Sequence, residues 1–197
     1  MTVRIFVLSL AILAAVVTAP AGAEQAAQPP PLRTPDVIFV PTPQEVVDAM
    51  LRLAKVTKND VVYDLGSGDG RIPISAAKLG ARAVGIDIDP QRITEATANL
   101  KDNSATDPTL PKRVTFLNQD LFTTDISQAT VVTLYLLPSL NVKLIPQLNK
   151  QLRPGTRIVS HAFDMSADGV ERKPITTENI NGRTIYFWTV PILPNPQ

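Results

Sequence analysis

The sequence predicts an α/β fold in which helices cover both faces of a mostly parallel sheet. Short apolar runs rich in β-branched residues alternate with stretches of helical spacing, as in right-handed βαβ units. One apolar run, 61–65, also leads directly into a turn with glycines at 66, 68 and 70. Glycine allows such a tight turn and lets a ligand approach the backbone closely. Ligands of these sheets bind at the carboxyl ends of the strands, so we expect the site at this turn.

The first helix is expected to begin at Thr42-Pro43. Thr42 is the predicted N-cap, Pro43 fits the first helical position, and Glu45 stands where a capping box needs an acidic residue. The apolar residues that follow share one helical face, which is typical of a helix packed on a core. They are Val46, Val47, Met50, Leu53 and Ala54.

The remaining elements follow from local signals. Asn59-Asp60 turns the chain into the strand at 61–65, and Asp89-Pro90 caps and starts a helix. Pro146 must break or bend the helix in which it lies, and Pro154-Gly155 is a turn. The expected strands are 61–65, 83–86, 114–117, 131–136, 157–160, a weak candidate at 170–176, and a stronger one at 183–190 that is rich in β-branched and aromatic residues. The expected helices are 71–78, 89–101 and 139–151, with a loop at 103–111.

The amino-terminal segment is not expected to belong to the fold. Arg4, the uncharged run 5–17 and the small residues 21–23 together have the pattern of a secretory signal peptide, predicted as residues 1–23. That run is short for a membrane span, although an uncleaved membrane anchor is the alternative. Residues 24–36, rich in Ala, Gln and Pro, are predicted to be a linker, and 37–197 to be the folded domain. We therefore expect a periplasmic or extracellular protein.

Composition excludes several kinds of chemistry. The 197 residues include 19 Lys and Arg and 18 Asp and Glu, for a formal net charge of +1, and no basic run marks a nucleic-acid groove. There is no cysteine, which excludes disulfides, thiolate nucleophiles and cysteine-based metal sites. The single histidine, His161, cannot form a metal site alone, and we expect it to be structural. No metal is expected.

Three aspartates follow consecutive strand ends. Asp64 ends the first predicted strand, Asp87 ends the second, and Asp120 with Leu121 follows the third. Because neighbouring parallel strands end at the same edge, these carboxylates are expected to form one rim. An aspartate in Asp87's place can accept hydrogen bonds from both ribose hydroxyls. Asp120 is placed to accept from an adenine amine, with Leu121 against the ring.

This rim indicates a cationic nucleoside ligand. Asp64 suits an ammonium group and would repel a pyrophosphate, and the glycine spacing differs from the G-x-G-x-x-G of dinucleotide loops. An adenosine with a charged amino-acid arm satisfies all three carboxylates, and S-adenosylmethionine is such a ligand. A nicotinamide-dependent reductase and a non-catalytic nucleoside-binding domain are the alternatives from other classes.

Over roughly residues 40 to 190 the chain resembles class I S-adenosylmethionine-dependent methyltransferases. The resemblance is carried by the glycine turn after Asp64 and by Asp87. It implies a Rossmann-like fold with a seven-stranded sheet. Residues that bind the cofactor are then expected to be Thr42, Asp64, Gly66, Ser67, Gly68, Gly70, Asp87, Asp120 and Leu121.

A narrower resemblance is to the lysine methyltransferases of the ATP synthase c-subunit and their bacterial relatives. It rests on residues 39–43, 46–47, 50–51, 134–138, 152–156 and 160–163. This family implies a protein lysine as acceptor and Pro41-Thr42 at the cofactor's amino-acid end. The resemblance to class I methyltransferases, which place acceptor-binding groups at the end of the fourth strand, makes Tyr135 and Pro138 candidates for the acceptor pocket. A small-molecule amine, hydroxyl or thiol is the alternative acceptor. Nucleic acid is not expected, because the chain lacks the catalytic cysteine of cytosine C5 enzymes and the Asp/Asn-Pro-Pro-aromatic tetrad.

Overall fold

The computed structural model describes residues 32–166 and 169–195. The predicted signal peptide and linker residues 24–31 lie outside the described residues. The strands are β1 (Val61–Leu65), β2 (Arg82–Asp87), β3 (Val114–Asn118), β4 (Val131–Leu134), β5 (Arg157–His161), β6 (Thr176–Ile180) and β7 (Arg183–Thr189). The helices are α1 (Gln44–Leu53), α2 (Arg71–Lys78), α3 (Pro90–Ser104), α4 (Pro138–Gln151) and the short 3-10 helix η1 (Leu110–Lys112).

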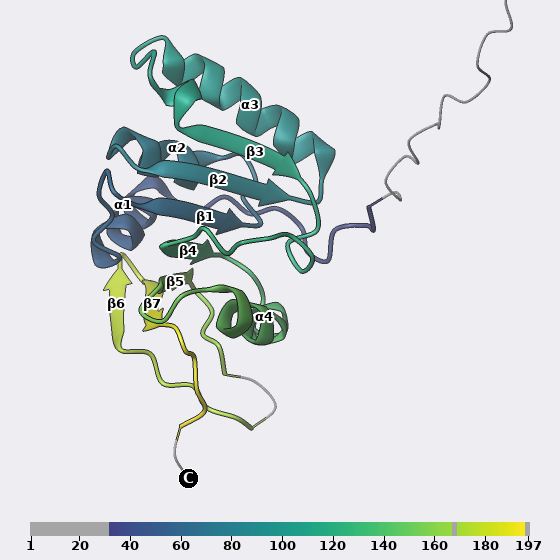
Figure 1. Cartoon of the computed structure of the whole chain (residues 1–197), viewed down its shortest axis with the longest axis vertical. Helices are drawn as coiled ribbons and strands as arrows, with labels where there is room; N and C mark the ends of the chain where they lie inside the picture. Colours follow the sequence, from purple (N-terminus) through teal and green to yellow (C-terminus); the bar gives the residue numbers. More distant parts are fainter. Residues whose placement is uncertain (1–31, 167–168, 196–197) are drawn as a thin grey trace, which may run out of the picture. The chain divides into compact units, whose positions relative to one another are not determined.

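The described strands form one seven-stranded sheet in the order β3-β2-β1-β4-β5-β7-β6, with β3 and β6 at its edges (Figure 1). Strands β3, β2, β1, β4 and β5 are parallel, whereas β7 runs antiparallel to both of its neighbours, β5 and β6. The chain order reverses between β1 and β4. Ligands bind at such a switch point, outside the carboxyl ends of the strands.

Each face of the sheet has its own hydrophobic layer. Val62 and Ala83 point to the face covered by α1 and α2, and Leu100 of α3 packs against the same layer. Tyr63 and Leu65 point to the opposite face, which α4 covers. This alternation of side chains along each strand fixes the register of β1 against its neighbours. The predicted α/β fold with helices on both faces is therefore confirmed.

Several predicted elements need correction. The weak strand expected at 170–176 was wrong, because β6 spans Thr176–Ile180 and Val170 makes only an isolated bridge. The sequence of β6 is polar because this edge strand has no buried face. Its residues alternate between partly exposed and exposed. Helix α4 runs from Pro138 to Gln151 without a break at Pro146, and β4 is shorter than expected. Among the described residues, none of the helices has the length and hydropathy that a bilayer span requires.

The amino terminus of α1 also differs from the prediction. Pro43 is the N-cap, and no side chain caps the helix. Thr42 is instead buried, with its hydroxyl oxygen 3.1 Å from His161 Nδ1. His161 of β5 therefore pairs with the Thr42 hydroxyl, which the local sequence assigned to the cap of α1.

Candidate active site

The turn after β1 has left-handed backbone at all three of its glycines. The φ angles are 84° at Gly66, 53° at Gly68 and 79° at Gly70. The backbone N–H groups of Gly66 and Ser67 both donate to the carbonyl of Ile86 at 2.9 Å. Residues with a side chain rarely adopt this backbone, so the glycines allow the chain to fold tightly against the end of β2.

Gly68 and Gly70 serve packing rather than the cavity wall. A Cβ on Gly68 would overlap the ring of Phe39, and one on Gly70 would lie 2.5 Å from the ring of Phe116. The cavity beside the turn is lined by Gly66 and Ser67, but not by Gly68 or Gly70. The glycines predicted as ligand contacts at 68 and 70 therefore act through the backbone shape that they permit.

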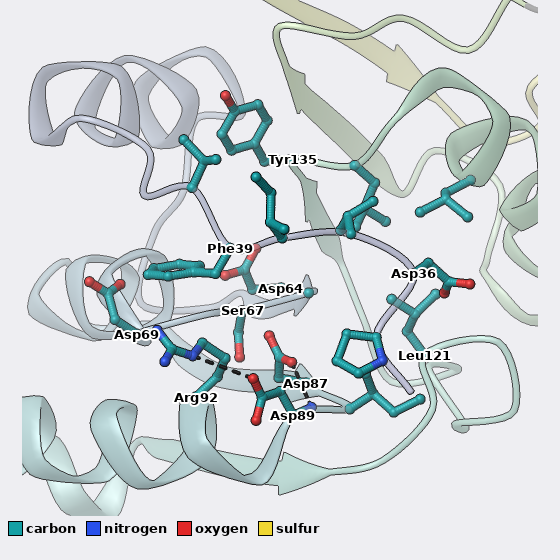
Figure 2. Close-up of a pocket in the computed structure, with 18 of the residues that line it drawn as sticks. Asp36, Phe39, Asp64, Ser67, Asp69, Asp87, Asp89, Arg92, Leu121 and Tyr135 are labelled. Atoms are coloured by element: carbon teal, nitrogen blue, oxygen red, sulfur yellow. Dashed lines mark hydrogen bonds and ion pairs between the residues drawn. The ribbon is translucent and has the colours of Figure 1, made fainter. Parts of the chain in front are cut away.

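The cavity has a volume of about 630 Å³ and lies at the carboxyl ends of β1, β2 and β4. It brings together the three aspartates that the sequence placed on one rim, Asp64, Asp87 and Asp120. Figure 2 shows Asp64 near the middle, with Asp87 on one side and Tyr135 on the other. We call the part around Asp87 the cofactor end and the part around Tyr135 the acceptor end.

Asp64 is a buried carboxyl, 3% exposed, in the wall of this cavity. Its Oδ1 accepts a hydrogen bond of 2.7 Å from the Thr133 hydroxyl of β4. Burial raises the pKa of Asp64 to about 8, and the charges of Asp87 and Asp69 contribute in the same direction. A cation placed in the cavity would favour the ionised form, because it would replace the hydration that burial removes.

Asp87 organises the turn as well as facing the cavity. Its carboxylate accepts from the backbone N–H of Gly68 at 2.8 Å and from that of Asp89 at 3.0 Å. Burial raises the pKa of Asp87, while these two backbone donors act against the shift. The carboxylate therefore joins the glycine turn to the start of α3, with its remaining acceptor capacity toward the cavity.

Asp120 and Leu121 line the cavity beyond β3. Asp120 forms an ion pair with Arg33, whose Nε lies 2.6 Å from one carboxylate oxygen. The hydrogen bond from Arg33 holds the pKa of Asp120 below its usual range. Arg33, in the stretch before α1, therefore occupies part of the Asp120 carboxylate, to which the sequence assigned an adenine contact.

Sequence reasoning gave no site role to residues 33–40, most of which line one side of the cavity together with Pro41. Phe39 is the main contact: its ring covers Gly68 and faces the Arg92 guanidinium at 4.9 Å. Arg71 anchors the end of the segment, since its Nη1 donates to the Thr42 carbonyl at 2.8 Å. The apolar run Phe39-Val40-Pro41 ahead of a helix was the available signal.

The acceptor end is largely apolar. Tyr135, Leu136 and Leu140 line it, together with the buried Thr42. Pro138, a predicted candidate for this pocket, is the first residue of α4 and does not line the cavity. Tyr135, the other candidate, does line the cavity, and Leu140 of α4 lines it as well.

The cavity favours a cationic ligand. Its walls contain six aspartates and three arginines. Ser67 Oγ, which belongs to the lining, is buried without a hydrogen-bond partner among the described residues. Within the same part of the chain, no cluster of carboxylates and histidine is suited to hold a metal ion. An adenosyl ligand with cationic groups fits this combination of excess negative charge and a free hydroxyl.

Comparison with protein families assigns the chain. The family profile described as ANTKMT methyltransferase domain matches residues 64–172. The chain belongs to this methyltransferase family. The resemblance drawn from the glycine turn and Asp87 is thus confirmed, and the chain is an S-adenosylmethionine-dependent methyltransferase.

Relatives of this ANTKMT-family chain include proteins from an archaeon and from animals. It is 45% identical over 159 residues to a protein-lysine N-methyltransferase of Saccharolobus islandicus, covering 79% of this chain and 95% of that protein. It is 28% identical to the human lysine N-methyltransferase of the ATP synthase c-subunit, covering 68% of this chain and 55% of that protein. The chain thus spans about half the length of the human relative.

Solved structures agree with the fold and the cofactor. A Salinibacter ruber protein described as an RNA methyltransferase, in complex with S-adenosylhomocysteine, is 54% identical. The match covers 77% of this chain and 94% of that chain, with a TM-score of 0.70. The Rossmann-like methyltransferase fold and S-adenosylmethionine as cofactor are confirmed.

Proposed function

We propose that this methyltransferase transfers the methyl group to the side-chain amine of a protein lysine. The observation that carries the proposal is the 45% identity to a protein named as a protein-lysine N-methyltransferase, of which the match covers 95%. The human relative is likewise named as a lysine N-methyltransferase. A small-molecule amine, hydroxyl or thiol would need another source of support, which the relatives' names do not give.

The acceptor end suits an amine on an apolar arm. Tyr135, Leu136 and Leu140 provide apolar surface for the methylene groups of lysine. A lysine amine must lose its proton before it can attack, and desolvation in such a pocket lowers its pKa. Binding in this pocket therefore prepares the nucleophile without a dedicated general base.

Residue roles at the cofactor end follow from position. We assign Asp87 to the ribose hydroxyls, Asp120 and Leu121 to the adenine, and Asp64 to the ammonium group. Ser67 Oγ, which has no hydrogen-bond partner among the described residues, is a further donor and acceptor beside them. Thr42, in the wall of the acceptor end, is assigned to the amino-acid arm of the cofactor, next to the bound lysine.

The mechanism is an in-line displacement that the protein promotes by orientation. When bound, the cofactor supplies an electrophilic methyl group on a sulfonium. The amine lone pair forms the new N–C bond as the C–S bond breaks; the electron pair remains on sulfur in S-adenosylhomocysteine, and the proton leaves to solvent. Holding the amine in line and excluding water are then the main contributions of the walls, Tyr135 and Leu136 among them.

RNA is the second candidate acceptor, because the 54% identical Salinibacter ruber protein is described as an RNA methyltransferase. Two observations favour lysine. Aspartates outnumber arginines two to one in the cavity walls, which opposes phosphate binding. The exposed residues Ile38, Val40 and Leu137, which lie on or next to the cavity lining, are apolar rather than basic.

The test uses the full chain with radiolabelled S-adenosylmethionine and a lysate of its own source. We expect label in protein, resistant to ribonuclease, sensitive to protease and recovered as methyl-lysine after acid hydrolysis. Label lost with ribonuclease would establish RNA as the acceptor. Label in small molecules alone would reject both, and no transfer at all would favour a non-catalytic nucleoside-binding protein.

We also propose that the protein is exported, with residues 1–23 as the signal peptide. The proposal is supported by the charged start, the apolar run and the small residues near position 23. Sequencing the mature amino terminus tests it: a start at Glu24 is expected. A start at Met1 would reject cleavage, and fractionation would then separate a membrane-anchored protein from one retained in the cytosol.

A further inference from the structure

His161 connects two walls of the acceptor end without lying on the cavity itself. It is the last residue of β5 and is 2% exposed. Its Nδ1 shares a hydrogen bond of 3.1 Å with Thr42 Oγ1, and its ring lies against the Tyr135 ring with the centroids 4.0 Å apart. Thr42 and Tyr135 both line the cavity, whereas the described lining does not include His161.

The backbone after His161 adds a second aromatic contact. Ala162 adopts a left-handed φ of 64°, and its N–H donates to Thr184 of β7. Phe163 N–H then donates to the carbonyl of His161 at 2.8 Å, which turns the chain back. The Phe163 ring stacks on Tyr135 with the centroids 6.2 Å apart. Strained backbone of this kind persists where the surrounding structure requires it, and it is often found at functional sites.

His161 is held in the neutral form. Burial lowers its pKa to about 4, and the charge of Arg183 contributes in the same direction. An uncharged ring can lie close against Tyr135, at an interplanar angle of 38°, and adds no repulsion to a cationic cofactor nearby. One ring nitrogen then serves Thr42, and the ring face serves Tyr135.

We propose that His161 is a positioning residue that holds Thr42 and Tyr135 as two walls of the acceptor end. We call the space between these walls, where the lysine side chain would lie, the lysine channel. The inference rests on the proposed lysine acceptor. It differs from an ordinary core role, because a core histidine would stabilise the fold without affecting one ligand more than another. A positioning role makes binding of the acceptor arm depend on His161 while the adenosine contacts stay intact.

Two substitutions separate the two contacts. His161→Phe keeps an aromatic ring against Tyr135 and removes the bond to Thr42. His161→Asn keeps a polar atom near the position of Nδ1 and removes the ring. Thr42→Val breaks the same hydrogen bond from its other side.

The measurement compares two probes by calorimetry on the full chain. One is S-adenosylhomocysteine, and the other is an adenosyl bisubstrate in which the position of the transferable methyl group is linked through carbon to the nitrogen of a butylamine, which has the length of the lysine side chain. Comparing the ratio of the two dissociation constants between variants reports the acceptor arm, because the charge and the adenosyl part of each probe are the same for every variant. Trp188→Phe is the matched control, because it removes a hydrogen bond from the buried Trp188 of β7 to the Arg172 carbonyl, away from the cavity.

We expect wild-type protein to prefer the bisubstrate and His161→Phe to reduce that preference about tenfold, the effect of one lost hydrogen bond. His161→Asn should reduce it by a similar factor, and adding Thr42→Val to His161→Phe should reduce it no further. Trp188→Phe should lower the melting temperature and leave the ratio unchanged.

Two outcomes overturn different claims. If the His161 variants keep the wild-type ratio while binding S-adenosylhomocysteine normally, His161 is a structural residue and the lysine proposal stands. If wild-type protein binds both probes equally, the lysine channel itself is rejected. Should His161→Phe fail to fold, Thr42→Val alone decides, because its ratio must fall in the same way.

Discussion

At the cofactor end, Gly68 and Asp87 come from two consecutive βα units and are joined by a hydrogen bond across 19 positions of the chain. At the acceptor end, Thr42 and His161 are joined across 119 positions. The first contact requires only that β1 and β2 pair. The second requires the stretch before α1 and the end of β5 to meet, and Tyr135, just after β4, packs against the same His161 ring.

This difference has a functional meaning. Parallel pairing of β1 and β2 dictates the cofactor end, so a small change in the turn should affect cofactor binding strongly. Residues 33–41, the stretch before α1, reach the same cavity mainly through exposed contacts, of which the ion pair between Arg33 and Asp120 is one. Exposed ion pairs contribute little, so changes there should have small effects.

The glycine turn should be the most sensitive part of the site. Gly68→Val places a branched side chain at a φ of 53° and into the ring of Phe39, and we expect more than about a hundredfold loss of S-adenosylhomocysteine affinity by calorimetry. Gly155→Ala is the control, because it has a similar left-handed φ of 86° with nothing within 4 Å of the added Cβ. Wild-type affinity in Gly68→Val would show that the cofactor binds elsewhere.

The next effect concerns the ribose assignment. Asp87→Ala removes the acceptor for ribose and for two backbone N–H groups, and we expect about a fiftyfold loss of affinity, in the range of charged hydrogen bonds. Asp107→Ala, in a loop outside the cavity lining, should change nothing. An unchanged dissociation constant for Asp87→Ala would refute the ribose contact.

A pH titration tests the role of Asp64. Since its pKa is raised to about 8, the carboxyl is mostly neutral at pH 6, and a bound ammonium favours its ionised form. Binding of S-adenosylhomocysteine then releases a proton, so the affinity for this ligand should rise about tenfold between pH 6 and pH 7.5. The Asp64→Asn variant should bind with no such slope. A flat wild-type profile would mean that Asp64 does not face the ammonium.

Residues 33–41 should respond least of all. Arg33→Gln breaks an exposed ion pair, so we expect less than about 0.5 kcal/mol change in the free energy of unfolding and less than about a threefold change in affinity. Calorimetry at low and physiological salt is the measurement. A loss of affinity above tenfold would contradict the contrast between the cofactor end and residues 33–41. These residues would then matter nearly as much as the carboxylates of the cofactor end.

Some parts of the fold were predictable because their signals are local. Asp64 and Asp87 could be placed on one rim because each ends an apolar strand run. Tyr135 was a candidate for the acceptor pocket through the resemblance to class I methyltransferases, which place acceptor-binding groups at the end of the fourth strand. The edge strand β6 was misplaced because its sequence is polar and lacks a buried face. Phe39 was missed because the apolar run Phe39-Val40-Pro41 signals packing but does not indicate that the Phe39 ring covers Gly68.

Local patterns in the chain were sufficient for the parallel strands, the glycine turn and the row of aspartates, since strand periodicity and left-handed glycines act over a few residues. The packed molecule was needed to see that Thr42 bonds His161 instead of capping α1, and that Arg33 engages Asp120. Such contacts join positions far apart in the chain. Their partners are chosen by how α1, β5 and residues 33–41 pack around the cavity, which no local pattern encodes.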